Sequence, residues 1–142
     1  AIEKSVEFGV KSIHPVLFER SIKKTLNFGR LSKVITSSAK QTGRSIFPEL
    51  KKILRFPDWI KKYENNNAFA CHFSGKSKIK NIVNLKTDDI MIIVGPEGDF
   101  SASEIALLNA SKVPLVNLGP RRLRTESACI SSILTTSDVI EG

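Results

Sequence analysis

The sequence contains few residues that could bind a metal or form a disulfide. It has two cysteines, two histidines, one tryptophan, one tyrosine and one methionine among 142 residues. Cys71 and Cys129 lie far apart and form no CxxC pair, and His14 and His72 add no zinc-ligand spacing. We therefore expect no metal site, and we expect both cysteines to be reduced residues of a cytoplasmic protein.

Long apolar segments are also absent. The longest uninterrupted apolar run covers residues 90–94, far below the roughly 20 residues of a membrane span. No secretory signal opens the chain, so we expect a cytoplasmic protein without a membrane partner. The first residue is Ala1 rather than Met, as in a piece of a longer protein. A composition of 41% hydrophobic and 25% charged residues is that of an ordinary folded domain.

The positive charge is concentrated in the first half of the chain. Residues 1–62 contain 14 Lys and Arg against 5 Asp and Glu, whereas residues 63–142 contain 8 against 9. The net charges are therefore +9 and −1. Such asymmetry favours a surface for a polyanion such as nucleic acid, although a merely soluble lysine-rich surface has the same composition.

Helical and extended patterns alternate along the sequence. The patterns predict helices over 1–8, 30–41, a short segment from 57, a segment from 101 and one from 125 or 126. They predict strands over 10–18, 68–73, 90–94 and 113–118, and a flexible basic loop over 74–80. This alternation is typical of one α/β domain with a mainly parallel sheet. The uniformly apolar run at 90–94 indicates a strand covered on both faces.

Three loops follow the best strands, over 72–76, 95–100 and 119–125. Ligands bind at the carboxyl ends of strands in open α/β sheets, so these loops should meet at one edge. The first glycine turn, Gly95 to Gly98, contains no P-loop lysine, and the GxGxxG dinucleotide motif is absent. Arg121, Arg122 and Arg124 precede the last helix, where guanidinium groups could recognise phosphates or base carbonyls; a solvated basic loop is the alternative.

Two motifs carry a family resemblance. Residues 93–101 read IVGPEGDFS and are followed by Glu104, and residues 118–128 read LGPRRLRTESA. Together they resemble the RsmE family, bacterial enzymes that methylate one uridine of 16S ribosomal RNA at the N3 ring nitrogen. The earlier segments VEFGV at 6–10, ERS at 19–21 and QTGR at 41–44 agree with this resemblance.

The resemblance implies a single SPOUT methyltransferase domain over residues 1–142. It implies a C-terminal trefoil knot, a bent S-adenosylmethionine within the knot, and a homodimer that completes the site. The expected RNA partner is 16S ribosomal RNA or the small ribosomal subunit. The family's N-terminal RNA-binding domain is expected to be absent from this chain. Two positions depart from the family pattern: Asp99 replaces a usual glycine, and Arg122 replaces an aliphatic residue.

Site residues follow from the residues and the resemblance together. Arg124 and Arg121 are expected to stabilise the uracil anion, and Glu126, or less readily Glu97, is a candidate proton acceptor, with loss to water as the competitor. The expected cofactor-binding residues are Phe73, Val94, Gly95, Glu97, Gly98, Leu118, Gly119 and Leu123. The expected RNA-binding residues are Arg20, Lys40, Arg44 and Arg122.

Two other functions remain open at this point. A SPOUT enzyme could instead methylate a ribose 2′-hydroxyl, or the chain could be an RNA-binding module without catalysis. The ribose enzymes usually have an early Asn-Glu pair and a late Ser-Leu-Asn stretch. This sequence has neither, and Arg-Thr-Glu-Ser occupies positions 124–127 instead.

Overall fold

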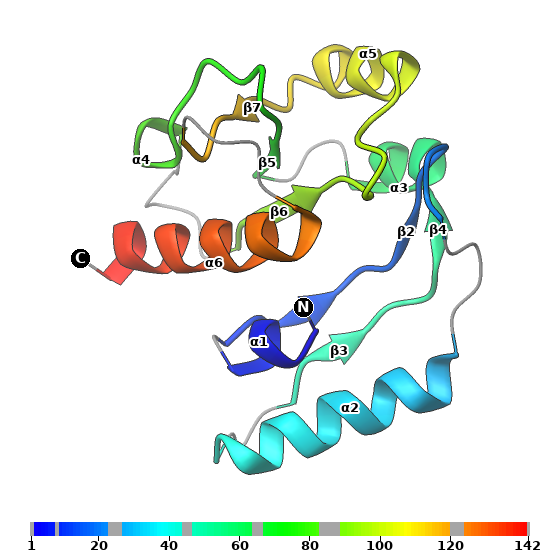
Figure 1. The fold of residues 1–142 in the computed structure, drawn as a ribbon, viewed down its shortest axis with the longest axis vertical. Helices are drawn as coiled ribbons and strands as arrows, with labels where there is room; N and C mark the ends of the chain where they lie inside the picture. The colour runs from blue at the N-terminus through cyan, green and yellow to red at the C-terminus, as the bar shows by residue number, and fades with distance from the viewer. Residues whose placement is uncertain are drawn as a thin grey trace.

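The computed structural model describes residues 2–7, 9–22, 27–43, 47–63, 67–82, 89–119 and 124–141. Figure 1 shows the elements in chain order. The helices are α1 Ile2–Glu7, α2 Phe28–Gln41, α3 Phe56–Tyr63, α4 Ile79–Ile82, α5 Ala102–Ala110 and α6 Thr125–Glu141. The strands are β1 Ser12–Ile13, β2 Val16–Leu17, β3 Glu49–Leu50, β4 Leu54–Arg55, β5 Ala68–Cys71, β6 Met91–Val94 and β7 Leu115–Val116.

The main sheet has three parallel strands in the order β6-β5-β7. Successive residues of the central strand point to opposite faces, so Phe69 and Cys71 join one apolar cluster and Ala70 joins another. Ile93 of β6 lies in the same cluster as Ala70, whereas Ile92 and Val94 pack on the opposite side. Both faces are therefore covered, as the uniformly apolar run at 90–94 predicts.

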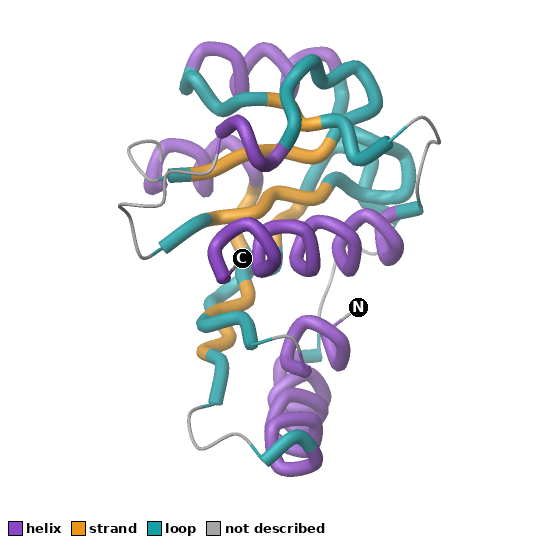
Figure 2. Tube along the Cα trace, turned by 90° about the vertical axis from the view of Figure 1, so that its left-hand side faces the viewer, coloured by secondary structure: helices purple, strands orange, loops and turns teal. Residues whose placement is uncertain are grey.

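Different helices cover the two faces of this sheet. Phe56, Trp59 and Ile60 of α3 and Leu108 of α5 belong to the cluster that contains Ala70 and Ile93. Ile79 of α4 and Val139 of α6 belong to the other cluster. Helix α6 runs beside β6 and against α4 (Figures 1 and 2). No helix in the described ranges is both long and apolar enough to cross a membrane.

The N-terminal part of the domain has a smaller core of its own. Strand β1 pairs with β3 and β2 pairs with β4, both in parallel. Helix α1 packs on α2, where Val6, Ile35 and Ala39 are buried and Ile13 and Leu50 cover them. At the end of α1, Gly9 takes a positive φ of 89° and its N–H donates to the Val6 carbonyl, as the predicted helix end requires.

The α/β class and the parallel sheets are confirmed, and several element boundaries were wrong. The predicted strand over 10–18 is two strands, because Pro15 has no N–H for the ladder between them. Strands β3 and β4 were not predicted; each has only two residues, too few to show an alternating pattern. The predicted loop over 74–80 contains the start of α4, and Ser77 bridges to Val116 of β7.

Candidate functional site

The carboxyl ends of β5, β6 and β7 open onto one pocket of about 420 Å³. This volume lies within the usual range for small-molecule sites. The three loops that follow these strands and the start of α6 form its wall, as the strand-end argument predicts. The lining residues are Cys71, His72, Phe73, Val94, Gly95, Pro96, Glu97, Asp99, Asn117, Leu118, Arg124, Thr125 and Ala128.

Backbone contacts with β7 fix the loop after β5. The His72 N–H donates to the Val116 carbonyl at 3.0 Å. Gly75 passes so close to β7 that a Cβ on it would lie 2.6 Å from the Leu115 carbonyl oxygen. The Asn117 side chain donates to the Phe73 carbonyl at 3.1 Å and accepts from the Gly119 N–H at 2.8 Å. Asn117 therefore joins the loops after β5 and β7.

The loop after β6 makes a tight turn between Pro96 and Asp99. The Asp99 N–H donates to the Pro96 carbonyl at 2.8 Å. Asp99 has a φ of 68°, a left-handed conformation that glycine adopts most easily and that aspartate tolerates better than most residues. One carboxylate oxygen of Asp99 accepts from the Phe100 N–H at 2.8 Å, which ties the strained residue to the buried Phe100.

Helix α6 is attached to the same loop at its first residue. The Thr125 hydroxyl donates to the Gly95 carbonyl at 3.1 Å. Arg124 immediately precedes the helix and lines the pocket, and its carbonyl accepts from the Ala128 N–H. This connection places a guanidinium at the pocket and joins the position of α6 to the glycine turn.

His72 and Asp99 form a polar pair on the pocket wall. The His72 Nε2 lies 3.3 Å from the second carboxylate oxygen of Asp99, and their side chains are 10% and 20% exposed. The Ser74 N–H donates to His72 Nδ1, so Nδ1 is an acceptor and Nε2 carries the proton that faces Asp99. The pair links the loops after β5 and β6. Asp99 and Glu97 line the same pocket as Arg124.

The thiol of Cys71 is a neutral wall group. Burial raises the pKa of Cys71 to about 12, so the thiol stays protonated near neutral pH. Within the described ranges, no group of three or more His, Cys, Asp and Glu side chains is arranged to hold a metal ion. The residues with polar side chains that line this pocket are His72, Glu97, Asp99, Asn117, Arg124 and Thr125, beside the Cys71 thiol.

A family model described as an RNA methyltransferase domain matches residues 1–137. The chain belongs to this family. It is 32% identical over 136 residues to the ribosomal RNA small subunit methyltransferase E of Rickettsia conorii, covering 94% of this chain and 56% of that protein. It is 34% identical to the enzyme of the same name from Aquifex aeolicus, covering 93% and 58%. These relatives confirm the RsmE resemblance, and the methyltransferase domain spans little more than half of their length.

Solved structures resemble this methyltransferase domain closely. The ribosomal RNA small subunit methyltransferase E of Neisseria gonorrhoeae, bound to S-adenosylmethionine, superposes with a TM-score of 0.88 at 28% identity, covering 97% of this chain and 59% of that chain. A putative methyltransferase from Legionella pneumophila in complex with the same cofactor gives 0.85 at 27% identity, covering 96% and 59%.

The pocket brings together most of the predicted catalytic and cofactor-binding residues that the structure describes. Six of them line it: Phe73, Val94, Gly95, Glu97, Leu118 and Arg124. Phe73 is 54% exposed, so part of its ring is open to solvent at the pocket wall. Leu123, Arg121, Arg122 and Arg44 lie outside the described residues.

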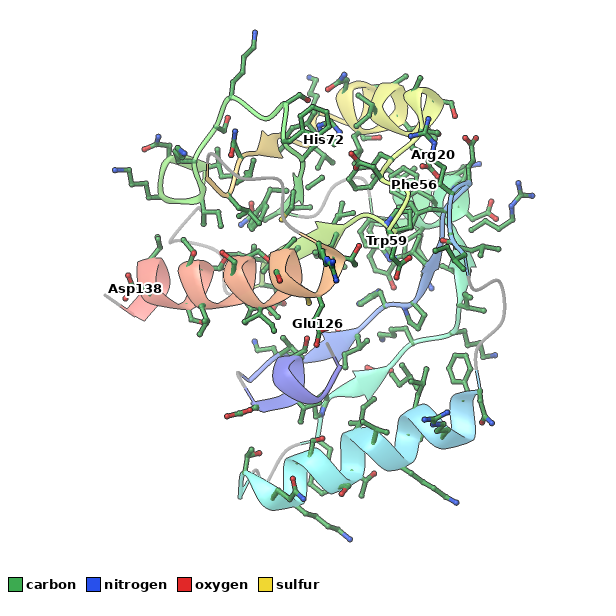
Figure 3. All side chains as sticks on the ribbon, in the orientation of Figure 1. Arg20, Phe56, Trp59, His72, Glu126 and Asp138 are labelled. Carbon is green, nitrogen blue, oxygen red and sulfur yellow. The ribbon has the colours of Figure 1, made fainter. Side chains whose placement is uncertain are left out.

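Other predicted residues of the methyltransferase domain lie off the pocket wall. Gly98 and Gly119 do not line the pocket. Gly119 has a positive φ of 142°. Glu126 is exposed in the first turn of α6; in Figure 3 it and His72 lie on opposite sides of the start of this helix. Lys40 is exposed near the end of α2. Arg20 is exposed, yet its guanidinium donates to two loop carbonyls.

Sequence reasoning missed several wall residues: Cys71, His72, Pro96, Asn117, Thr125 and Ala128. Each lies in or beside one of the motifs that identified the loops. His72 and Asn117 are the first polar residues after the apolar residues of β5 and β7, and this was the available signal, although both lie inside the strands predicted over 68–73 and 113–118. Asp99 was noticed as a departure from the family, but its link to His72 required the structure.

Proposed function

We propose that this domain catalyses transfer of a methyl group from S-adenosylmethionine to uridine N3 of 16S ribosomal RNA. The observation that carries the proposal is the pocket itself, in which three strand-end loops and Arg124 meet. The named relatives act on small-subunit ribosomal RNA, and two similar structures contain S-adenosylmethionine. The uridine and its N3 position come from the motif resemblance.

The pocket wall fits an adenosine and a charged amino-acid tail. Phe73, Val94 and Leu118 offer apolar surface for a purine, and Asn117 with the backbone around Gly95 offers polar contacts. Glu97 and Asp99 favour a cationic or hydroxyl-bearing ligand. The cofactor supplies an electrophilic methyl carbon on a sulfonium. Gly98 and Gly119 do not line the pocket and stay in the proposed set, together with Leu123, only through the motif resemblance.

Arg124 is the proposed catalytic residue on the RNA side. Uracil N3 becomes a nucleophile when it loses its proton, and the resulting negative charge spreads over the two flanking carbonyl oxygens. A guanidinium can donate to such oxygens with two N–H groups, so Arg124, aided by Arg121, would stabilise the anion. Holding the nucleophile in line with the methyl group supplies much of the remaining rate enhancement.

The proton of N3 needs an acceptor before the new carbon–nitrogen bond forms. Glu97 lines the pocket, whereas Glu126 does not. We therefore assign the proton to Glu97 or to water in preference to Glu126. One proton leaves N3, one methyl group arrives, and the sulfonium becomes a neutral thioether.

The RNA would approach over the basic N-terminal half. Arg30, Lys33 and Lys40 are exposed and recur along one side of α2, while Ile35, Ser38 and Ala39 are buried on the other side. Arg44 and Arg122, outside the described residues, are proposed to extend this contact. Ribosomal RNA is a cytoplasmic substrate, so we place the protein in the cytoplasm.

We also propose the homodimer and the trefoil knot of the SPOUT fold. For the dimer, α6 offers Leu134, which is 46% exposed, and half-buried Ile130. Ile133, a third apolar residue of this helix, is buried within its own chain and is not available. Light scattering at tens of micromolar should give twice the monomer mass; a monomer would contradict the dimer.

Calorimetry and nucleoside analysis test the function together. Titration with S-adenosylmethionine should release heat with one site per chain. Incubation of the protein with cofactor and unmodified 16S ribosomal RNA, followed by digestion and mass spectrometry, should yield 3-methyluridine. Cofactor binding with 2′-O-methyluridine as product would replace N3 by the ribose as the target. RNA binding without any heat from S-adenosylmethionine would leave an RNA-binding module and overturn the enzyme assignment.

A further inference from the structure

A short turn after β2 lies against the loop after β6, residues 95–100, which we call the cofactor loop. The Phe18 N–H donates to the Ser21 hydroxyl at 3.0 Å and the Ser21 N–H donates back to the Phe18 carbonyl at 3.2 Å. The ring of Phe18 meets the ring of Phe100 edge to face, with centroids 5.4 Å apart. The turn, residues 18–21, is thus held by two internal hydrogen bonds, and Phe18 packs it against Phe100 in the main core.

Arg20 extends from this turn along the loop after β6 (Figure 3). Its Nη1 donates to the Gly98 carbonyl at 3.2 Å and to the Phe100 carbonyl at 3.3 Å. A Cβ on Gly98 would lie 2.8 Å from the Cβ of Arg20, closer than real Cβ contacts. Glycine is therefore required at 98 so that the loop can approach Arg20.

The two carbonyls that Arg20 holds belong to loop residues that do not line the pocket. Gly95, Pro96, Glu97 and Asp99 line the pocket, whereas Gly98 and Phe100 do not. In a planar trans peptide the C=O and the next N–H point in opposite directions, so holding the Gly98 carbonyl orients the Asp99 N–H. That N–H closes the turn onto the Pro96 carbonyl at 2.8 Å.

A second set of bonds keeps the turn in register with α5. The Glu19 N–H donates to one carboxylate oxygen of Glu104 at 2.9 Å, and Glu104 is 2% exposed. The Ser103 hydroxyl donates to the Glu19 carboxylate at 2.9 Å. Glu104 also accepts from the Ser101 N–H as part of the capping box of α5. The turn therefore contacts both ends of the 98–104 segment.

We infer that Arg20 is a positioning residue for the cofactor loop. Its guanidinium holds the Gly98 and Phe100 carbonyls outward, and this fixes the inward wall on which S-adenosylmethionine would bind. The inference rests on the proposed function, because it concerns the affinity of the same pocket. The sequence analysis expected Arg20 to contact RNA; we now assign it this positioning role instead.

Calorimetry with S-adenosylmethionine tests the inference on three variants. Arg20→Ala should weaken the Kd about tenfold, because two hydrogen bonds from a charged donor are lost. Arg20→Lys should retain part of the affinity, since an ammonium can reach one carbonyl. Arg55→Ala, which removes another exposed arginine of the same half, should leave the Kd unchanged. A purely structural loss would lower the binding stoichiometry while the folded fraction kept the wild-type Kd.

Salt-dependent RNA binding separates the inference from its competitor. If Arg20 contacts a phosphate, Arg20→Ala should reduce the slope of log affinity against log salt by about 1 and leave the cofactor Kd unchanged. That result, or a wild-type cofactor Kd in Arg20→Ala, would overturn the inference. Absence of cofactor binding by the wild-type protein would instead refute the proposed function.

Discussion

Arg124 is the residue on which the proposed chemistry depends most directly. It lines the pocket and immediately precedes α6, whose first residue is bonded to the Gly95 carbonyl. Arg124→Ala should reduce single-turnover methylation by about 10²–10³, the usual cost of losing a donor to a developing anion, with little change in cofactor Kd. Arg124→Lys should recover little because a point charge cannot bridge two oxygens.

Two measurements separate this role from a structural one. If Arg124 only supports the fold, the alanine variant should lose thermal stability and cofactor affinity together. Arg55→Ala serves as the control for removing an exposed arginine. Full single-turnover activity of Arg124→Ala would rule out the catalytic role.

Asp99 combines a strained backbone with useful side-chain contacts. Asp99 and Lys112 both have positive φ, 68° and 58°, but Asp99 also bonds the Phe100 N–H and lies 3.3 Å from His72. Lys112→Gly should raise the free energy of unfolding by about 0.5–1 kcal/mol through relief of strain. Asp99→Gly should gain nothing or lose up to about 1 kcal/mol, because the lost contacts offset the same relief.

Urea unfolding followed by Trp59 fluorescence measures both variants. Asp99→Ala keeps the strain and loses the contacts, so it should be the least stable of the three. Equal stabilisation by Asp99→Gly and Lys112→Gly would mean that the Asp99 carboxylate contributes nothing. Asp99 is one of the two departures from the family pattern, and its contacts with Phe100 and His72 could be found only in three dimensions.

At the scale of elements, His14 joins the β1–β2 segment to α3. Its Nδ1 accepts from the Trp59 indole N–H at 3.2 Å, and its Nε2 lies 3.0 Å from the Ser12 hydroxyl. Burial, followed by the positive charge of Lys51, lowers the pKa of His14 below its ordinary 6.5. Protonation would also remove the acceptor that the Trp59 indole uses.

The direction of the pH dependence follows from this lowered pKa. Between the folded-state pKa and 6.5 the unfolded chain binds more protons at His14 than the folded protein does. The contribution of His14 is therefore complete above 6.5 and is lost as pH falls through the folded-state pKa. His14→Gln can accept from Trp59 without titrating, so its unfolding free energy should decrease less from about pH 7.5 to about pH 5. Identical pH profiles in urea unfolding would contradict the assignment.

The elements that could be predicted from sequence are those with a strong local pattern. The strands predicted over 68–73 and 90–94 and the capping box at Ser101 each correspond to an observed strand or helix start, although the first strand ends at Cys71. Strands β3 and β4 carry two residues each, and only their pairing partners define them. Gly98 also shows that long-range contacts could not be predicted from local sequence. This glycine was expected to bind the cofactor, but the residue that lies close to it is Arg20, 78 positions away.

At the scale of the whole molecule, positive charge and pocket lie in different halves of the sequence. The pocket is built from residues 71–128, in the half with nearly balanced charge. The basic half contributes α2 and the turn at 18–21, which contacts the cofactor loop. An RNA bound along α2 would therefore contact the same half of the sequence that supplies the 18–21 turn against the loop after β6.

This arrangement predicts how RNA affinity responds to salt. Affinity for 16S ribosomal RNA should fall steeply from about 50 to about 200 mM salt, because each neutralised phosphate releases counterions. The double variant Lys33→Ala/Lys40→Ala removes two exposed cations from α2 and should reduce the log–log slope by about 2. Lys112→Ala, in the balanced half, should leave the slope unchanged. Fluorescence anisotropy over this salt range measures all three proteins. Equal slopes would show that α2 does not contact the RNA backbone, and a salt-independent wild-type affinity would refute the electrostatic basis of RNA binding.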